Sequence, residues 1–184
     1  MTYEMDIAGL KRDLPLCKVS EELYIGAFVM FGDVELTVHC AGELLKRAPE
    51  YDYLIAPEAK AIPLLYEMAR QSGANKYFLA RKGVKAYMSE PFEVNVKSIT
   101  TANVQRLVLD KNDADMMKGK RMLILDDVIS TGESMKAMEE LVERAGGIVA
   151  GKMAVLAEGD AIDRDDIIVL APLPLFNPDG SVKA

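Results

Sequence analysis

The stretch from Lys120 to Ser134, with the helical pattern that follows it, constrains the fold more than any other part of the sequence. Met122 to Leu125 is an uninterrupted apolar run, which is typical of a strand buried on both faces. After Ser134, apolar residues recur at steps of three and four, which predicts an amphipathic helix that ends near Gly146. The chain therefore contains a buried parallel strand that opens directly into a helix.

Two carboxylates and a turn rich in hydroxyls lie between this strand and this helix. The first amides of a helix have no intrahelical partners and readily bind an anion, and Gly132 lets the backbone approach it closely. Asp126 and Asp127 would repel a phosphate, so they suit vicinal hydroxyls or a magnesium ion beside it. The hydroxyls that can face the phosphate are those of Ser130, Thr131 and Ser134. Phosphate, diol and metal together describe a phosphorylated sugar.

Two other interpretations of this stretch stay open. An apolar strand ending in Asp-Asp also resembles the magnesium-binding strand of nucleotide triphosphatases, and acidic strand ends are often simply solvated. The sequence contains neither G-x-x-x-x-G-K-[ST] nor G-x-G-x-x-G, so the first alternative lacks its other half. We therefore favour sugar-phosphate binding over a purely structural turn.

The segment from Asp126 to Ser134 resembles the phosphoribosyl pyrophosphate-binding signature of the type I phosphoribosyltransferases. The resemblance implies that Asp126 and Asp127 hold the ribose 2′ and 3′ hydroxyls and act in catalysis. It also implies that the 5′-phosphate is bound by Ser130, Thr131, Gly132, Glu133 and Ser134. Glu133 stands where many members have a second glycine, and we expect its side chain to point to solvent.

Two earlier segments extend the resemblance. Glu58-Ala59-Lys60-Ala61 is similar to the Glu-Ala-Arg-Gly loop of adenine phosphoribosyltransferases, with a lysine that lacks the planar fork of arginine. Arg81-Lys82-Gly83-Val84-Lys85 resembles the family's Arg-Lys-x-x-Lys stretch. The pyrophosphate contacts that these segments imply are Glu58, Ala59, Lys60, Arg81, Lys82 and Lys85, and Lys85 is also a catalytic candidate. The plainer alternatives are that Lys60 pairs with Glu58 or faces solvent, and that the cation cluster is a solvated surface.

The base is the least determined part of the expected site. Phe28 and Val128 are candidates for apolar contact with it, and Glu93 is a guess for the proton donor because the Tyr-x-Leu-Glu-Tyr pattern of many adenine enzymes is missing. Hypoxanthine-guanine enzymes carry an aspartate where Ser130 stands, so adenine is the first choice among purines. Xanthine or hypoxanthine is the alternative. A non-catalytic regulator that binds phosphoribosyl pyrophosphate is the second alternative.

The alternation of apolar runs and helical patterns predicts an α/β fold. We expect an open, mainly parallel twisted sheet of about five strands flanked by helices, with strands near 53–56, 76–80, 122–125, 148–156 and 167–170. We expect one domain over 1–184, with a small hood in 1–38 and a flexible loop and hairpin in 81–109. A second hairpin is expected over 23–38 around Gly32-Asp33, followed by a short helix over 41–47.

Composition limits the partners. With 22 basic and 29 acidic residues the net charge is −7, which disfavours nucleic acid as a partner. No apolar run approaches the roughly 18 residues of a membrane span, and no secretory signal is seen. Cys17 and Cys40 form no spacing pattern of a disulfide framework, so we expect a cytoplasmic location. His39 is the only histidine, and we expect it to have a structural role. The resemblance implies Mg²⁺ as cofactor, without assigned protein ligands, and a homodimer.

Overall fold

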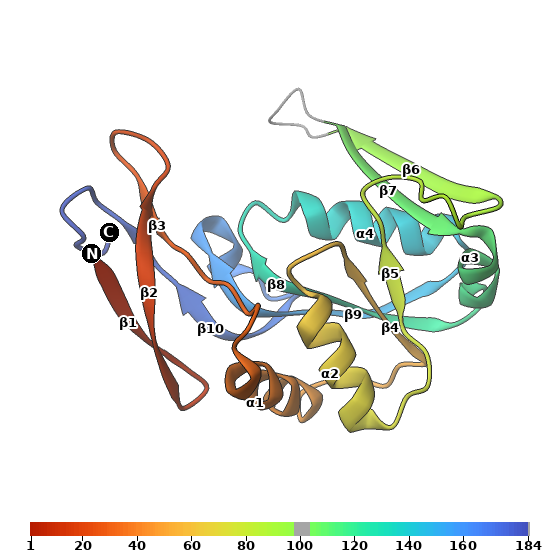
Figure 1. Cartoon of the computed structure of the whole chain (residues 1–184), viewed down its shortest axis with the longest axis horizontal. Coiled ribbons are helices and arrows are strands. Elements are labelled where there is room, and N and C mark those ends of the chain that lie inside the picture. Colours follow the sequence, from red (N-terminus) through yellow and green to blue (C-terminus); the bar gives the residue numbers. More distant parts are fainter. Residues whose placement is uncertain (98–103, 184) are drawn as a thin grey trace.

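A five-stranded parallel sheet forms the centre of the protein in the computed structural model, which describes residues 1–97 and 104–183 (Figure 1). The strand order is β10-β9-β8-β4-β5, and every neighbouring pair is parallel. The strands are β4 (Tyr53–Pro57), β5 (Phe78–Ala80), β8 (Arg121–Ile129), β9 (Ile148–Glu158) and β10 (Ile168–Leu173). This confirms the predicted α/β class and the predicted parallel sheet.

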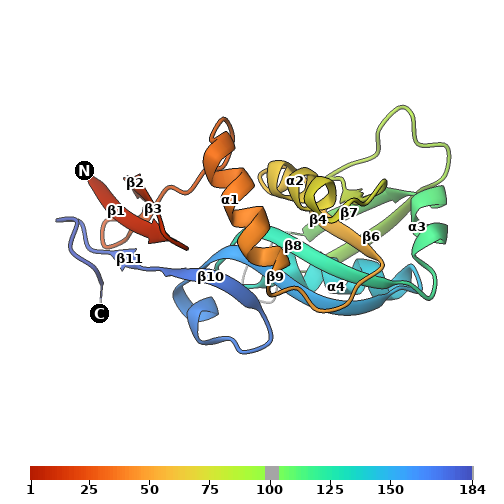
Figure 2. The ribbon, with the colours of Figure 1, turned by 90° about the horizontal axis from the view of Figure 1, so that it is seen from below.

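Helices cover both faces of this sheet (Figure 2). Helices α1 (Val34–Leu45) and α2 (Ile62–Ser72) lie on one face, and α4 (Glu133–Arg144) lies on the other. Side chains alternate along β8, so Leu123 and Leu125 join the core under α1 and α2, whereas Met122 and Ile124 join the core under α4. The central strand is therefore buried on both faces, as its apolar run predicted.

The hairpin predicted over 23–38 is wrong. Only β3 (Tyr24–Gly26) is a strand, and α1 begins at Val34 rather than at Ala41. Asp33 caps this helix, because its Oδ1 accepts a hydrogen bond from the Leu36 N–H at 3.0 Å. The buried positions Leu36, Thr37, Cys40, Ala41 and Leu44 recur at helical spacing, and this periodicity outweighs the strand preference of the valines.

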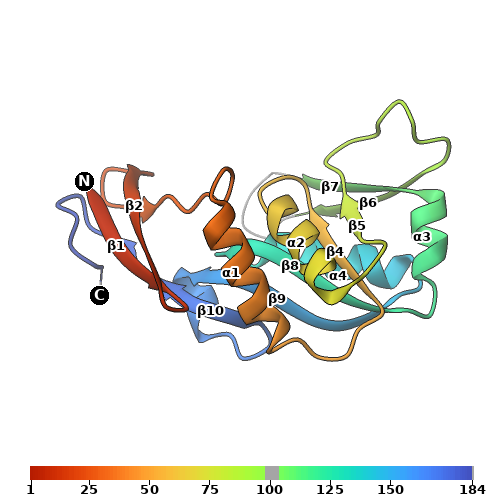
Figure 3. The same ribbon diagram turned by 60° about the horizontal axis from the view of Figure 1, so that its bottom comes forward.

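A second, antiparallel sheet joins the two ends of the chain (Figure 3). It has the order β1-β2-β3-β11, with β1 (Thr2–Ile7), β2 (Leu10–Lys18) and β11 (Leu175–Phe176). The rings of Tyr3 and Phe176 lie with their centroids 4.9 Å apart, so the apolar tail packs onto the N-terminal strands. His39 Nε2 lies 2.7 Å from the Ala8 carbonyl oxygen, which agrees with a structural role for this histidine.

The hairpin predicted within 81–109 is present as β6 (Pro91–Lys97) and β7 (Val104–Asp110), and the residues between the two strands, 98–103, lie outside the described residues. Two backbone hydrogen bonds of 2.8 Å between Arg81 and Val108 fasten this hairpin to the end of β5. The described residues also form two short helices, α3 (Lys111–Met117) and η1 (Gly159–Asp163). None of the described helices is long and apolar enough to cross a membrane.

Candidate active site

The carboxyl ends of β4 and β8, together with β7, enclose a cleft of about 510 Å³. Parallel strands end at the same edge of a sheet, and ligands of open α/β sheets bind at that edge. The residues that line the cleft are Pro57, Glu58, Ala59, Lys60, Lys82, Arg106, Leu107, Asp126, Asp127, Val128 and Ser134. The structure thus brings together residues from all three segments on which the sequence analysis relied.

The two aspartates form the buried floor of this cleft. Asp126 is 9% exposed and Asp127 is 2% exposed. Asp126 Oδ1 accepts a hydrogen bond of 2.9 Å from the backbone N–H of Asp127. Burial, reinforced by the neighbouring Asp127 carboxylate, raises the pKa of Asp126 above its usual range. Two adjacent carboxylates in such a place require a cation or hydroxyl donors to stabilise their charge.

Lys60 supplies a cation to this pair. Its Nζ lies 2.9 Å from Asp127 Oδ2, which makes the two residues an ion pair. The angles at these atoms are not those of a hydrogen bond. Asp127 Oδ2 is therefore buried without a hydrogen-bond partner among the described residues. The Lys60 side chain is 54% exposed and reaches inward from the turn between β4 and α2. The alternative that Lys60 pairs with Glu58 is therefore wrong, because Lys60 contacts Asp127 in the floor of the cleft instead.

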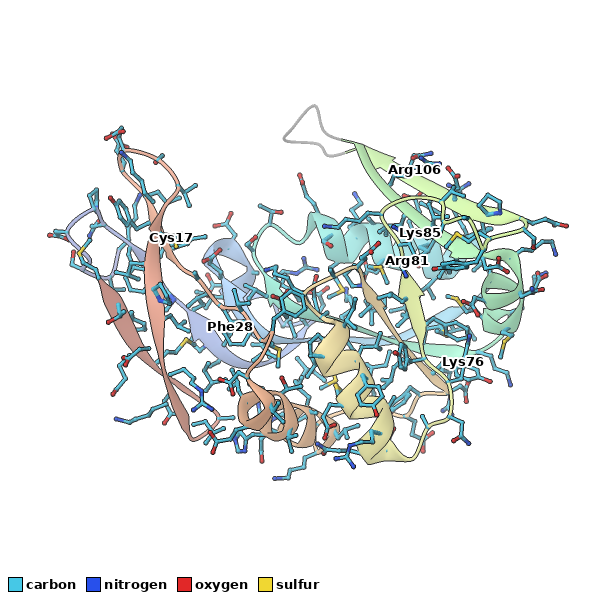
Figure 4. All side chains as sticks on the ribbon, in the orientation of Figure 1. Cys17, Phe28, Lys76, Arg81, Lys85 and Arg106 are labelled. Carbon is cyan, nitrogen blue, oxygen red and sulfur yellow. The ribbon has the colours of Figure 1, made fainter. Side chains whose placement is uncertain are left out.

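Glu58 organises the predicted cation cluster instead. Its Oε2 accepts hydrogen bonds of 3.1 Å from Arg81 Nε and from the Lys82 backbone N–H, and it lies 3.8 Å from Lys85 Nζ. The Lys82 N–H and then the Arg81 side chain lower the pKa of Glu58. Figure 4 shows Arg81 and Lys85 where β5 meets the hairpin, with Arg106 above them. The cluster is therefore held at the sheet's carboxyl edge and is not a freely solvated surface.

The hydroxyl-rich turn leads from β8 into α4 as predicted. Gly132 has φ of 76° and caps the helix, a left-handed conformation that favours glycine. Ser134 lines the cleft, whereas Ser130 and Thr131 are exposed and Glu133 is partly exposed. The Glu133 N–H lies 3.4 Å from Thr131 Oγ1. The amides at the start of α4 are thus positioned beside the two aspartates.

The two candidate base contacts lie in different places. Val128 lines the cleft directly after Asp127. Phe28 is 4% exposed and belongs to the core under α1 and α2, rather than to the described lining of the cleft (Figure 4). The structure therefore brings Val128, and not Phe28, to the wall of this cleft.

Arg106 and Leu107 line the cleft and were missed by the sequence analysis. Arg106 donates to both carboxylate oxygens of Glu93, at 3.0 and 2.6 Å, across the hairpin. Glu93, the guessed proton donor, is therefore engaged in an ion pair. The signal that could have identified Arg106 is a lone arginine within an apolar hairpin strand, but only the docking of that hairpin on β5 brings it to the site.

A magnesium ion fits this cleft only with oxygens from a ligand. Asp126 and Asp127 offer hard oxygen ligands, and Asp127 Oδ2 is buried and lacks a hydrogen bond. The described residues contain no group of three or more histidine, cysteine, aspartate or glutamate side chains that could hold a metal. Since magnesium takes about six oxygen ligands, the remaining ones must come from water and from the bound ligand.

Comparisons with known proteins show the family of the chain. A family model described as phosphoribosyl transferase domain matches residues 39–170. An adenine phosphoribosyltransferase of Thermosipho africanus is 29% identical over 167 residues, which cover 89% of this chain and 94% of that protein. An orotate phosphoribosyltransferase of Caldanaerobacter subterraneus is 31% identical over 115 residues, which cover 62% of this chain and 46% of that protein.

The fold of the chain is shared with a solved structure. The crystal structure of an adenine phosphoribosyltransferase from Thermoanaerobacter pseudethanolicus has a TM-score of 0.66 and 23% identity, and the match covers 94% of this chain and 95% of that chain. The matched family segment runs from α1 to β10 and contains both carboxylates, the turn and the cation cluster. The chain belongs to the type I phosphoribosyltransferase family.

Proposed function

We propose that the protein transfers the phosphoribosyl group of magnesium phosphoribosyl pyrophosphate to a ring nitrogen of a purine, with adenine as the preferred base and AMP and pyrophosphate as products. The observation that carries this proposal is that Asp126, Asp127 and Lys60 line one cleft together with Ser134 from the first turn of α4. Adenine phosphoribosyltransferases of Thermosipho africanus and Petrotoga mobilis, similar over 89% and 97% of this chain, support the choice of base.

In this proposal the ribose lies over the aspartates and its phosphate lies in the turn. Asp126 and Asp127 accept hydrogen bonds from the 2′ and 3′ hydroxyls, one of which supplies the hydrogen bond that the buried Asp127 Oδ2 lacks. The backbone amides and hydroxyls of 130–134 bind the 5′-phosphate at the start of α4. These contacts hold the ribose C1′ in place while its bond to pyrophosphate breaks and a bond to the base nitrogen forms.

The leaving pyrophosphate lies on the opposite wall. We assign it to Glu58, Ala59, Lys60, Arg81, Lys82 and Lys85, where the backbone and the cations stabilise the departing charge. The Lys60 ammonium carries three N–H donors, so it can contact the pyrophosphate while it stays beside Asp127. Bound magnesium supplies further positive charge to the phosphate oxygens.

The base-binding region and the assembly are part of the same proposal. We assign Val128 to one face of the base, and the antiparallel sheet of β1, β2, β3 and β11 to the hood that covers it. Two unpaired cysteines support a cytoplasmic location. Apolar side chains that are about half or more exposed near the start of α1 support a homodimer, which sedimentation would test. These side chains are Val29 51%, Phe31 51% and Val34 73%.

A substrate panel tests the function. Adenine, hypoxanthine, guanine, xanthine and orotate are each offered with magnesium phosphoribosyl pyrophosphate, and pyrophosphate release is measured against Asp127→Asn as the inactive control. We expect turnover with adenine above all others. Turnover with xanthine or hypoxanthine would change the base, and turnover with orotate alone would refute a purine substrate. Tight binding of phosphoribosyl pyrophosphate without turnover of any base would indicate a regulator instead of an enzyme.

A further inference from the structure

Arg164 lies directly against the turn that precedes α4. Arg164 Nη1 occupies the space in which a Cβ at position 132 would lie, so the guanidinium lies against the backbone of Gly132. Arg164 follows η1 in the connection between β9 and β10. The left-handed φ of 76° favours glycine at 132, and a larger residue there would also displace the end of the Arg164 side chain.

The direction of this guanidinium is fixed by its neighbours. Asp166 accepts from Arg164 Nε at 2.9 Å and from Nη2 at 2.7 Å, which is a two-pronged ion pair. Asp166 also pairs with Lys152 of β9, and Lys152 pairs with Glu139 of α4. Among the described residues Nη1 has no acceptor, and it is the nitrogen that faces the turn. The network thus holds one unused donor group over Gly132.

The turn itself offers little positive charge for a phosphate. The sequence from Val128 to Met135 contains no lysine or arginine, and it contains one acidic residue, Glu133. The amide dipoles at the start of a helix are equivalent to only about half a charge, whereas a phosphate monoester carries close to two negative charges at neutral pH. The charge of the Arg164 guanidinium is shared with Asp166, so what it would add to the turn is a charged hydrogen-bond donor whose direction is already fixed.

We infer that Arg164 is a further binding residue for the phosphoryl group that occupies the turn of 130–134, to which its Nη1 donates a hydrogen bond. This inference rests on the proposed function, because that function assigns a phosphate to the turn. It adds a cation from the β9–β10 connection to a site otherwise built from amides and hydroxyls.

Affinity for ribose 5-phosphate, measured by titration calorimetry, tests the inference. Arg164→Gln should weaken binding roughly 10-fold or more, the scale of one hydrogen bond to a charged group. Arg144→Gln is the matched control, because it changes a 53% exposed arginine at the far end of α4. In steady-state assays Arg164→Gln should raise KM for phosphoribosyl pyrophosphate and leave KM for the base unchanged. Arg164→Lys should restore part of the affinity. Unchanged affinity in a folded Arg164→Gln protein would overturn the inference.

A measurement on the unaltered protein guards against a variant that fails to fold. Phenylglyoxal modifies accessible arginines, and mass spectrometry of peptides locates the adducts. Ribose 5-phosphate should protect Arg164 and leave Arg144 reactive, whereas equal modification of Arg164 with and without the sugar phosphate would refute a contact. Failure of the unaltered protein to bind ribose 5-phosphate at all would overturn the proposed function together with this inference. Intact binding without protection or affinity loss would overturn the inference alone.

Discussion

Replacing Lys60 by methionine should destabilise the folded protein, and the loss should grow with pH. Lys60 Nζ is the cation 2.9 Å from Asp127 Oδ2, whose side chain is 3% exposed. Removing one partner of a fully buried ion pair costs about 3–5 kcal/mol. The Lys60 side chain is 54% exposed, so water screens the pair and we expect about 1–2 kcal/mol at neutral pH.

The pH dependence follows from Asp126. Burial and then the Asp127 charge raise its pKa in the folded state, while Lys60 opposes the rise. A raised carboxyl pKa stabilises the fold at low pH, and that contribution is lost as the pH rises through the folded-state pKa. Without Lys60 the pKa of Asp126 rises further, so the protein loses more stability in the alkaline range. At about pH 5 Asp126 stays protonated in both proteins, and the difference between them should be smallest.

Urea unfolding of the unaltered protein and of Lys60→Met, each at about pH 5 and about pH 9, measures this difference. Lys60→Arg keeps the charge and should retain most of the stability. Lys46→Met removes an exposed lysine that pairs with Glu43, and it should change the free energy of unfolding by no more than about 0.5 kcal/mol. Equal stability of Lys60→Met and the unaltered protein at both pH values would refute the view that Lys60 neutralises the aspartate floor.

Three further predictions concern other parts of the molecule. Gly132→Ala should lower the free energy of unfolding by about 1–2 kcal/mol, because alanine is strained at the left-handed φ of 76°. The added methyl group should also displace Arg164, so we expect a lower Tm and a higher KM for phosphoribosyl pyrophosphate. An unchanged Tm would contradict this prediction. Glu67→Gln should cost about 1–2 kcal/mol at neutral pH, because the carboxylate accepts two hydrogen bonds from Arg70. Arg70 lowers the pKa of Glu67 to about 2. The loss of unfolding free energy in Glu67→Gln should therefore be full above the ordinary pKa of 4.5 and should shrink as the pH falls toward 2. A loss that stays the same near pH 2 would count against the ion pair. Chelation of magnesium should abolish turnover and leave the Tm unchanged. The reason is that the described residues contain no group of three or more histidine, cysteine, aspartate or glutamate side chains that could hold the ion without a ligand. A large fall in Tm would instead indicate a structural metal.

The sequence by itself determined the parts of the site that depend on neighbouring residues. An apolar run, two aspartates, a hydroxyl-rich turn and a helix with a 3.6-residue period follow one another in the chain, and local hydrogen bonding and burial give them one conformation. The same holds for the 58–61 and 81–85 segments, each of which directly follows its strand. Eight of the lining residues named above were therefore candidates before the fold was known: Glu58, Ala59, Lys60, Lys82, Asp126, Asp127, Val128 and Ser134.

Only the tertiary structure decided the contacts between segments far apart in the chain. The pairing of Lys60 with Asp127, the entry of Arg106 through the docked hairpin, and the position of Arg164 over Gly132 join residues that have no local relationship. The start of α1 at Val34 also depends on the tertiary structure. The valines at this end favour a strand locally, but the apolar side of the helix is stabilised by packing into the core under α1 and α2. Periodicity reports which side of an element is buried, but the partner that buries it is set by packing of the whole chain.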